Sequence, residues 1–167
     1  MGAHFNMACV IGRTLFVHAG INKHSIANLD SIGQMARMWL LEGGQVPRPL
    51  SDAFNNMLWE RRYHEDPSVW SSKDAEKACA ELRELLNKHD LDRIVCGHTP
   101  RAHGEIEATW DGLVYNIDLP LNQWMQRHSD ENADEQSVKV QVLVLDPGEP
   151  EPVVLTDYRE ADPRYFF

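Results

Sequence analysis

The sequence predicts an α/β protein, and three features of the chain predict that class. Two short apolar segments, residues 13–17 and 92–96, have the composition of buried strands. Between them, residues 27–42 and 72–88 carry apolar residues at helical spacing. After the second strand the chain continues as strand-like segments separated by turns. The order of strand, helices, strand and antiparallel strands indicates an α/β fold whose second part is a β meander.

The first half of the chain predicts one strand and one long helix. Residues 13–17, Arg-Thr-Leu-Phe-Val, are apolar enough for a buried strand. A helix is expected over 27–42, and the two glycines at 43–44 are expected to end it. The stretch 45–51 contains two prolines and is predicted to be a loop.

The second half predicts an amphipathic helix and then a series of strands. Residues 72–88 place alanine, cysteine and leucine on one face of a helix. Segments 105–109 and 113–117 flank the sequence Trp-Asp-Gly, which predicts a hairpin turn. The last predicted strands cover residues 138–145 and 153–155.

Composition and charge restrict the partners and the compartment. The 167 residues are 43% hydrophobic and 25% charged, as in globular proteins. A formal net charge of −10 disfavours nucleic acid and anionic membrane surfaces as partners. No apolar run approaches the roughly 18 residues that span a bilayer, and the N-terminus lacks the features of a signal peptide. The three cysteines form no CxxC pair, so we expect free thiols and an intracellular protein, in the cytoplasm or an organelle lumen.

Two predicted strands end in a histidine beside a glycine. His18 follows the first strand in the run His18-Ala19-Gly20, and His98 follows the second in Gly97-His98. Sites in α/β sheets form at the carboxyl ends of strands, and imidazole is a common metal ligand. Either histidine alone is read more readily as an ordinary loop residue, but two in matched positions favour a shared site. The other histidines are expected to be solvated: His4, His24, His64, His89, His103 and His128.

Four short segments agree in order and spacing with the sequence blocks of one enzyme family. Residues 15–21 (LFVHAGI) are similar to its FVHGG block, and residues 94–100 (IVCGHTP) to its VVGHT block. Between them, residues 59–63 (WERRY) resemble its W-x-R-x-Y stretch, and residues 104–118 resemble the segment that follows. Over roughly residues 13–125 the chain therefore resembles the phosphoprotein phosphatases, which are calcineurin-like metallophosphoesterases, in their Shewanella-like type.

The resemblance implies the C-terminal half of a four-layer α/β/β/α sandwich and metal-dependent phosphoester hydrolysis of the serine/threonine-phosphatase type. It implies two divalent or transition metal ions (Mn, Fe or Zn), with His18 and His98 as ligands. Arg61 matches the arginine that grips the phosphate of a phosphorylated protein or small phosphomonoester. Arg62 takes that role if the register is shifted by one, and otherwise forms a surface salt bridge. Tyr63 either contacts substrate or packs as a core aromatic.

The family's three N-terminal blocks (GDxHG, GDxxDRG and GNHE) do not occur in the sequence. Residues 1–156 are therefore predicted to be a partial metallophosphoesterase domain, followed by a tail at 157–167. Such a chain would be active only if the missing half were supplied. The alternative is a metal-free, non-catalytic subunit of the pseudophosphatase kind, with a structural role in a larger assembly. In both cases a protein partner or self-association is expected to cover the missing half.

Overall fold

The chain divides into two compact units in its computed structural model. The first consists of residues 1–99 and 108–116, and the second of residues 100–107 and 117–167. The structure describes residues 6–51, 56–101, 105–119, 140–146, 148–149 and 151–156.

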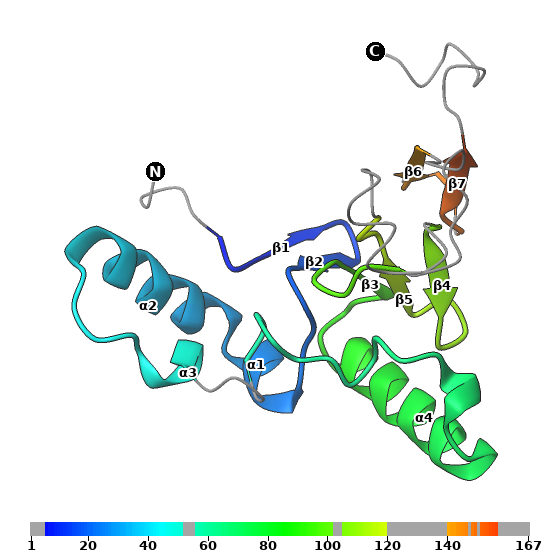
Figure 1. The fold of residues 1–167 in the computed structure, drawn as a ribbon, viewed down its shortest axis with the longest axis horizontal. Helices are drawn as coiled ribbons and strands as arrows, with labels where there is room; N and C mark the ends of the chain where they lie inside the picture. Colours follow the sequence, from blue (N-terminus) through cyan, green and yellow to red (C-terminus); the bar gives the residue numbers. More distant parts are fainter. Residues whose placement is uncertain are drawn as a thin grey trace, which may run out of the picture. The chain divides into compact units, whose positions relative to one another are not determined.

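A mixed five-stranded sheet in the order β1-β2-β3-β5-β4 organises the fold (Figure 1). Strand β2 runs antiparallel to β1 and parallel to β3, and β3 runs parallel to β5. Val17 lies opposite Cys96, the last residues of β2 and β3, so these two strands end side by side. The residues that follow them therefore meet at one edge of the sheet. The strands are β1 (Ala8–Ile11), β2 (Thr14–Val17), β3 (Arg93–Cys96), β4 (Glu107–Thr109) and β5 (Val114–Asn116).

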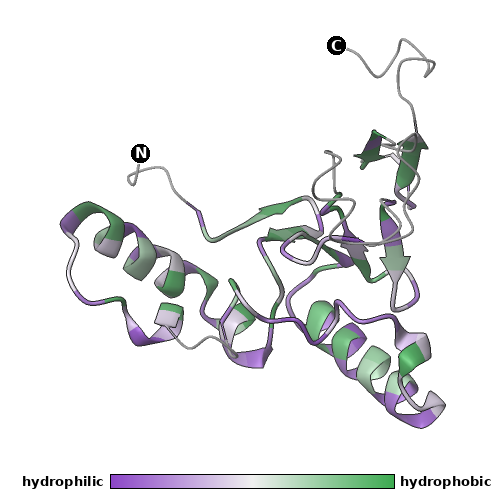
Figure 2. Ribbon diagram, in the orientation of Figure 1, coloured by the Kyte–Doolittle hydropathy of each residue, from purple (hydrophilic) through white to green (hydrophobic). Residues whose placement is uncertain are grey.

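The helices are α1 (Lys23–Ala27), α2 (Leu29–Glu42), α3 (Arg48–Ser51) and α4 (Ser72–Lys88), with a 3₁₀ turn, η2, at Pro67–Val69. Side-chain caps begin helices α1 and α4, and buried residues lie on one face of α2 and α4. The Ser71 side chain accepts a hydrogen bond from the Asp74 N–H and so caps α4. Hydrophobic and hydrophilic residues alternate along α2 and α4, and the central strands are hydrophobic (Figure 2). One core cluster joins the helices to the sheet, and it includes Leu15, Ile32, Leu82, Leu86, Ile94 and Val114.

The predicted α/β class is confirmed, and so are the strands near 13–17 and 92–96, the helix over 72–88 and the two segments of the hairpin. The predicted helix over 27–42 is interrupted by Asn28, which ends α1 and precedes α2. The Asn28 amide side chain donates to the His24 carbonyl, a local hydrogen bond that competes with a continuous helix. The predicted loop at 45–51 contains α3, a single turn that follows Pro47. The four-layer arrangement stays a prediction.

The second unit contains a two-stranded antiparallel sheet of β6 (Gln141–Val144) and β7 (Val153–Thr156). Both strands agree with the sequence prediction. The Gln141 side chain accepts a hydrogen bond from the Ile106 N–H and donates one to the Thr156 hydroxyl. The predicted tail at 157–167 lies outside the described residues, so the domain boundary at residue 156 stays a prediction. None of the helices described is long and apolar enough to cross a bilayer.

Candidate functional site

Two histidine side chains meet where β2 and β3 end. His18 directly follows β2, and His98 lies two residues beyond β3. The Gly97 N–H donates to the His18 carbonyl at 2.9 Å and joins the two loops. As a result, His18 Nε2 lies 3.0 Å from His98 Nδ1, and the two ring centroids are 4.9 Å apart. The sequence predicted that these two histidines share one site. In the structure their side chains are in hydrogen-bond contact.

Arg61 extends this pair into a row of three side chains, named here the His–His–Arg row (His18, His98 and Arg61). Its Nη2 lies 3.1 Å from His98 Nε2. A guanidinium is always a donor, so His98 Nε2 accepts. In a neutral His98 ring the proton therefore sits on Nδ1, which donates to His18 Nε2. Each hydrogen bond in the row thus has a defined direction, from Arg61 through His98 to His18.

The backbone around the row is constrained at two points. His98 has φ 74°, in the left-handed region that residues with a side chain seldom occupy and that costs about 1–2 kcal/mol. Such strained residues concentrate at functional sites. Gly20 lies so close to the loop carrying Arg61 that a Cβ there would stand 2.8 Å from the Glu60 carbonyl oxygen. Glycine at this position therefore allows that loop to approach the end of β2.

Two further residues contact the row and were not predicted as site residues. Trp59 is 48% exposed, and its ring meets His98 edge to face at 5.1 Å between centroids. His64 was expected to be solvated, and that expectation is wrong because its ring is only 6% exposed. Its two nitrogens bond Thr99 Oγ1 and the Ala19 carbonyl, each at 2.7 Å. The sequence signal for both was their position, since Trp59 and His64 flank Arg61 within a few residues.

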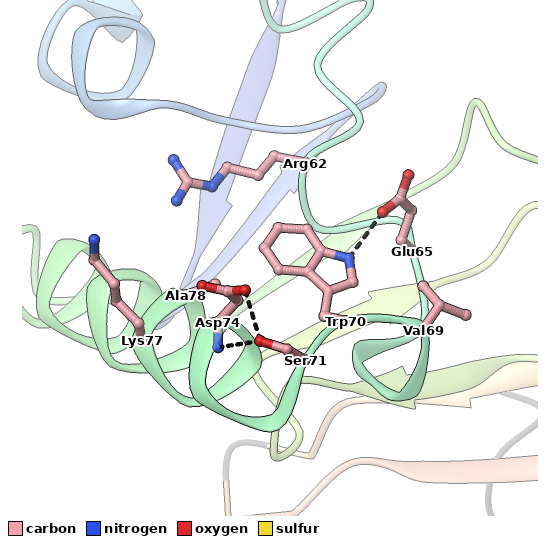
Figure 3. A pocket seen from close by; sticks show the side chains of 8 residues that line it. All are labelled: Arg62, Glu65, Val69, Trp70, Ser71, Asp74, Lys77 and Ala78. Carbon is pink, nitrogen blue, oxygen red and sulfur yellow. Dashed lines mark hydrogen bonds between the residues drawn. The ribbon is translucent and has the colours of Figure 1, made fainter.

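Arg62 and Tyr63, the other predicted substrate contacts, point elsewhere. Arg62 Nη2 pairs with Glu81 at 2.8 Å. The Tyr63 ring is 6% exposed and packs against Trp110, and its burial raises the pKa of its hydroxyl. Arg62 instead lines a separate pocket near the start of α4 (Figure 3), together with Glu65, Val69, Trp70, Ser71, Asp74, Lys77 and Ala78.

Arg61 is therefore the member of the predicted phosphate-binding set that contacts His98, which in turn contacts His18. The Trp70 indole in the Arg62 pocket donates to Glu65, and Ser71 bonds Asp74 (Figure 3). With Arg62 paired to Glu81, most polar groups of that pocket already have partners within the chain.

The donor set at the row does not fit the predicted metal centre. Among the described residues there is no group of three or more His, Cys, Asp or Glu side chains that would hold a metal ion. Two imidazoles are too few ligands for one structural or catalytic metal, and far too few for two. His18 and His98 also direct nitrogens at each other. The predicted cofactor of two Mn, Fe or Zn ions with His18 and His98 as ligands is therefore wrong.

Comparisons with known proteins show similarity at the level of fold. No family model matches the chain, and no curated protein matches it. A solved structure of a cold-active protein tyrosine phosphatase is similar, with 22% sequence identity and a TM-score of 0.51. The match covers 68% of this chain and 32% of that chain, so this chain spans about a third of its length. The enzyme from the psychrophile Shewanella sp. matches with 22% identity and a TM-score of 0.49, over 68% and 33% of the two chains.

These comparisons correct the predicted family and function. The expected relatives were calcineurin-like metallophosphoesterases of the serine/threonine-phosphatase type, acting with metal ions. The similar solved structure is described instead as a protein tyrosine phosphatase. The resemblance rested on four short segments. His18, His98 and Arg61, from three of these segments, hydrogen-bond in a row, and the described residues include no group of three or more metal-ligand side chains. At 22% identity the similarity shows the fold alone, which is α/β.

Proposed function

We propose that this chain binds phosphate monoesters through the His–His–Arg row, as part of a phosphatase-like fold. The observation that carries the proposal is the hydrogen-bonded arrangement of Arg61, His98 and His18 at the ends of two parallel strands. A guanidinium offers parallel N–H groups that match two phosphate oxygens. The coarse similarity to a phosphatase fold supports the same ligand class.

The local charge at the row favours an anion although the chain as a whole is acidic. The chain has a formal net charge of −10. At the row, the Arg61 guanidinium supplies a permanent positive charge, which attracts a phosphate dianion. Both oxygens of the neighbouring Glu60 carboxylate accept hydrogen bonds outside the row, from the Arg62 N–H and the Asn22 amide.

Trp59 gives a reason to prefer aryl phosphates within this class. The residue is half exposed, and its ring centroid lies 5.1 Å from that of His98, so we expect its exposed part to lie next to a phosphate ester held by the row. Aromatic pairs contribute about 0.5–1.5 kcal/mol beyond the burial of their area. A phosphotyrosine side chain in a protein would place its ring there. The similar structure, a protein tyrosine phosphatase, supports this choice of ligand for the present chain.

Titration with phenyl phosphate, followed by the histidine resonances in NMR spectra, tests the proposal. Loss of a hydrogen bond to a charged group costs about 1.5–3 kcal/mol, so Arg61→Gln should weaken binding at least tenfold. The matched control is Arg48→Gln, because Arg48 is exposed on α3. Equal binding by the Arg61→Gln protein, or equal losses in both variants, would show that the row is not the phosphate site.

Two further measurements extend the test to the leaving group and to hydrolysis. Phenyl phosphate should bind more tightly than an alkyl phosphate to the wild-type chain, and Trp59→Ala should remove that preference. Hydrolysis of the bound ester is a proposal of the same kind. Release of p-nitrophenol from p-nitrophenyl phosphate, reduced by Arg61→Gln and not by Arg48→Gln, would support it.

A further inference from the structure

His64 makes two hydrogen bonds from inside the protein, one with each ring nitrogen. Its Nε2 lies 2.7 Å from the Ala19 carbonyl oxygen, and its Nδ1 lies 2.7 Å from Thr99 Oγ1. A carbonyl can only accept, so Nε2 carries a proton. In the neutral ring Nδ1 then accepts from the Thr99 hydroxyl. The residue is 6% exposed, so these two bonds are shielded from water.

The two residues that His64 holds are the immediate successors of the two site histidines. Ala19 follows His18, and Thr99 follows His98. Ala19 is fully buried, and its N–H donates to the Met57 carbonyl at 3.0 Å. The His64 ring also lies 6.4 Å from the His98 ring, centroid to centroid. A single side chain therefore bridges the two loops at the point where each presents its histidine.

The third member of the row is tied to the same residue through the backbone. The His64 N–H donates to the Arg61 carbonyl at 3.0 Å and closes the turn from residue 61 to residue 64. A shift of His64 would thus move the loop that carries Arg61 as well as the loops that carry His18 and His98. The His64 ring thus joins the loops of His18 and His98, and the His64 backbone joins the turn that carries Arg61.

We infer that His64 is a positioning residue, which sets the separation of His18, His98 and Arg61 without touching the ligand. This inference rests on the proposed function, since it concerns the site that binds phosphate. Its physical basis is that charged ligands are bound through short, directed hydrogen bonds, and a displacement of about 1 Å can cost on the order of a hundredfold in a reactive site. The strained φ of His98 is a reason for such a support, because strained residues persist only where the surroundings hold them.

The chemistry of the two bonds defines the informative substitutions. His64→Phe keeps an aromatic ring of similar volume and removes both hydrogen bonds. His64→Gln retains an amide N–H group that can reach the Ala19 carbonyl, so it should restore part of the function. Thr99→Val removes the hydroxyl partner and leaves the histidine ring in place. The matched control is His24→Gln, because His24 is exposed on α1.

The experiment measures phenyl phosphate binding by NMR for the wild type and these variants, together with the imidazole ¹⁵N shifts of His18 and His98. His64→Phe should weaken binding about tenfold or more and change the ¹⁵N shifts that report the His98-to-His18 hydrogen bond. His64→Gln should recover part of the affinity, and His24→Gln should bind like the wild type. Circular dichroism of each variant establishes that it is folded, and Thr99→Val provides the same test if His64→Phe is not.

The outcomes separate this inference from the proposed function. If Arg61→Gln abolishes binding while folded His64→Phe binds like the wild type, the positioning role is refuted and the phosphate site stands. If His64→Phe does not fold, the same conclusion follows when folded Thr99→Val binds like the wild type. Unchanged ¹⁵N shifts in a weakly binding His64→Phe protein would also overturn it. If Arg61→Gln itself leaves binding unchanged, the proposed function fails, independently of His64.

Discussion

The left-handed backbone of His98 predicts an inverted order of stability for glycine and alanine at that position. His98→Gly and His98→Ala both remove the imidazole, so they lose the same contacts with His18, Arg61 and Trp59. The two variants therefore differ only in the backbone term. His98 has φ 74°, where glycine is unstrained and alanine is not.

The size of the difference follows from two opposing terms. Relief of the left-handed strain favours glycine by about 1–2 kcal/mol. The greater freedom of glycine in the unfolded chain disfavours it by about 0.4–1 kcal/mol. The net expectation is that His98→Gly is more stable than His98→Ala by about 0.5–1 kcal/mol, with phosphate binding lost in both.

Urea unfolding followed by circular dichroism checks this order. With a slope of about 2 kcal/mol per molar urea, the midpoint of His98→Gly should exceed that of His98→Ala by about 0.25–0.5 M. The control is the same pair of substitutions at Glu84, an exposed residue inside α4. There glycine should be less stable than alanine by about 1 kcal/mol. If alanine is the more stable residue at both positions, the strain assigned to His98 does not exist.

Three other predictions concern glycine, thiols and high pH. Gly20→Ala should destabilise the chain by about 1–3 kcal/mol in urea unfolding, because its Cβ would stand 2.8 Å from a backbone oxygen. The control is Gly33→Ala in α2, where a Cβ meets no close neighbour, and it should be neutral or stabilising by up to about 1 kcal/mol. If Gly33→Ala is the more destabilising of the two, the close contact at Gly20 is refuted. Cys9 is exposed, whereas burial and a carboxylate partner raise the pKa of Cys79. Cys9 should therefore react faster with iodoacetamide at pH 8, as peptide mass spectrometry would show, and equal rates would contradict the shift. Burial likewise raises the pKa of Tyr63. The contribution of the neutral hydroxyl to stability is therefore complete below about pH 10, the ordinary pKa, and is lost as the pH rises through the raised value. A Tyr63→Phe variant should lose less stability above pH 10 than the wild type, and a parallel decline of the two proteins would exclude this cause.

Much of the local structure was predictable from the sequence, because its causes are local. The apolar strand before His18, the helix over 72–88 and the glycines that end α2 each depend on neighbouring residues only. The start of α1, which the helix expected over 27–42 does not include, has a local signal too. Asn22 and Ser25 form a reciprocal capping box, in the Asn-x-x-Ser spacing of a helix start.

The predicted metal centre failed because ligand geometry is not a local property. A histidine at a strand end is compatible with a metal, a ligand or another histidine, and the sequence pattern is the same for all three. Here His18 and His98 bond each other, which their separation of 80 residues in the chain does not reveal. The choice between Arg61 and Arg62 as the phosphate-binding residue could not be made from local sequence either, because the course of the loop directs Arg61 to His98 and Arg62 to Glu81.

The sequence by itself determined that this is an α/β protein with histidines at the ends of two strands, because apolar periodicity, caps and glycine positions act over a few residues. Only the tertiary structure decided that these histidines form a directed row with Arg61, and that His64 is a buried support rather than a solvated side chain. The physical reason is that hydrogen bonds require atoms within about 3 Å, and the parallel pairing of β2 with β3 brings together residues that the chain keeps far apart.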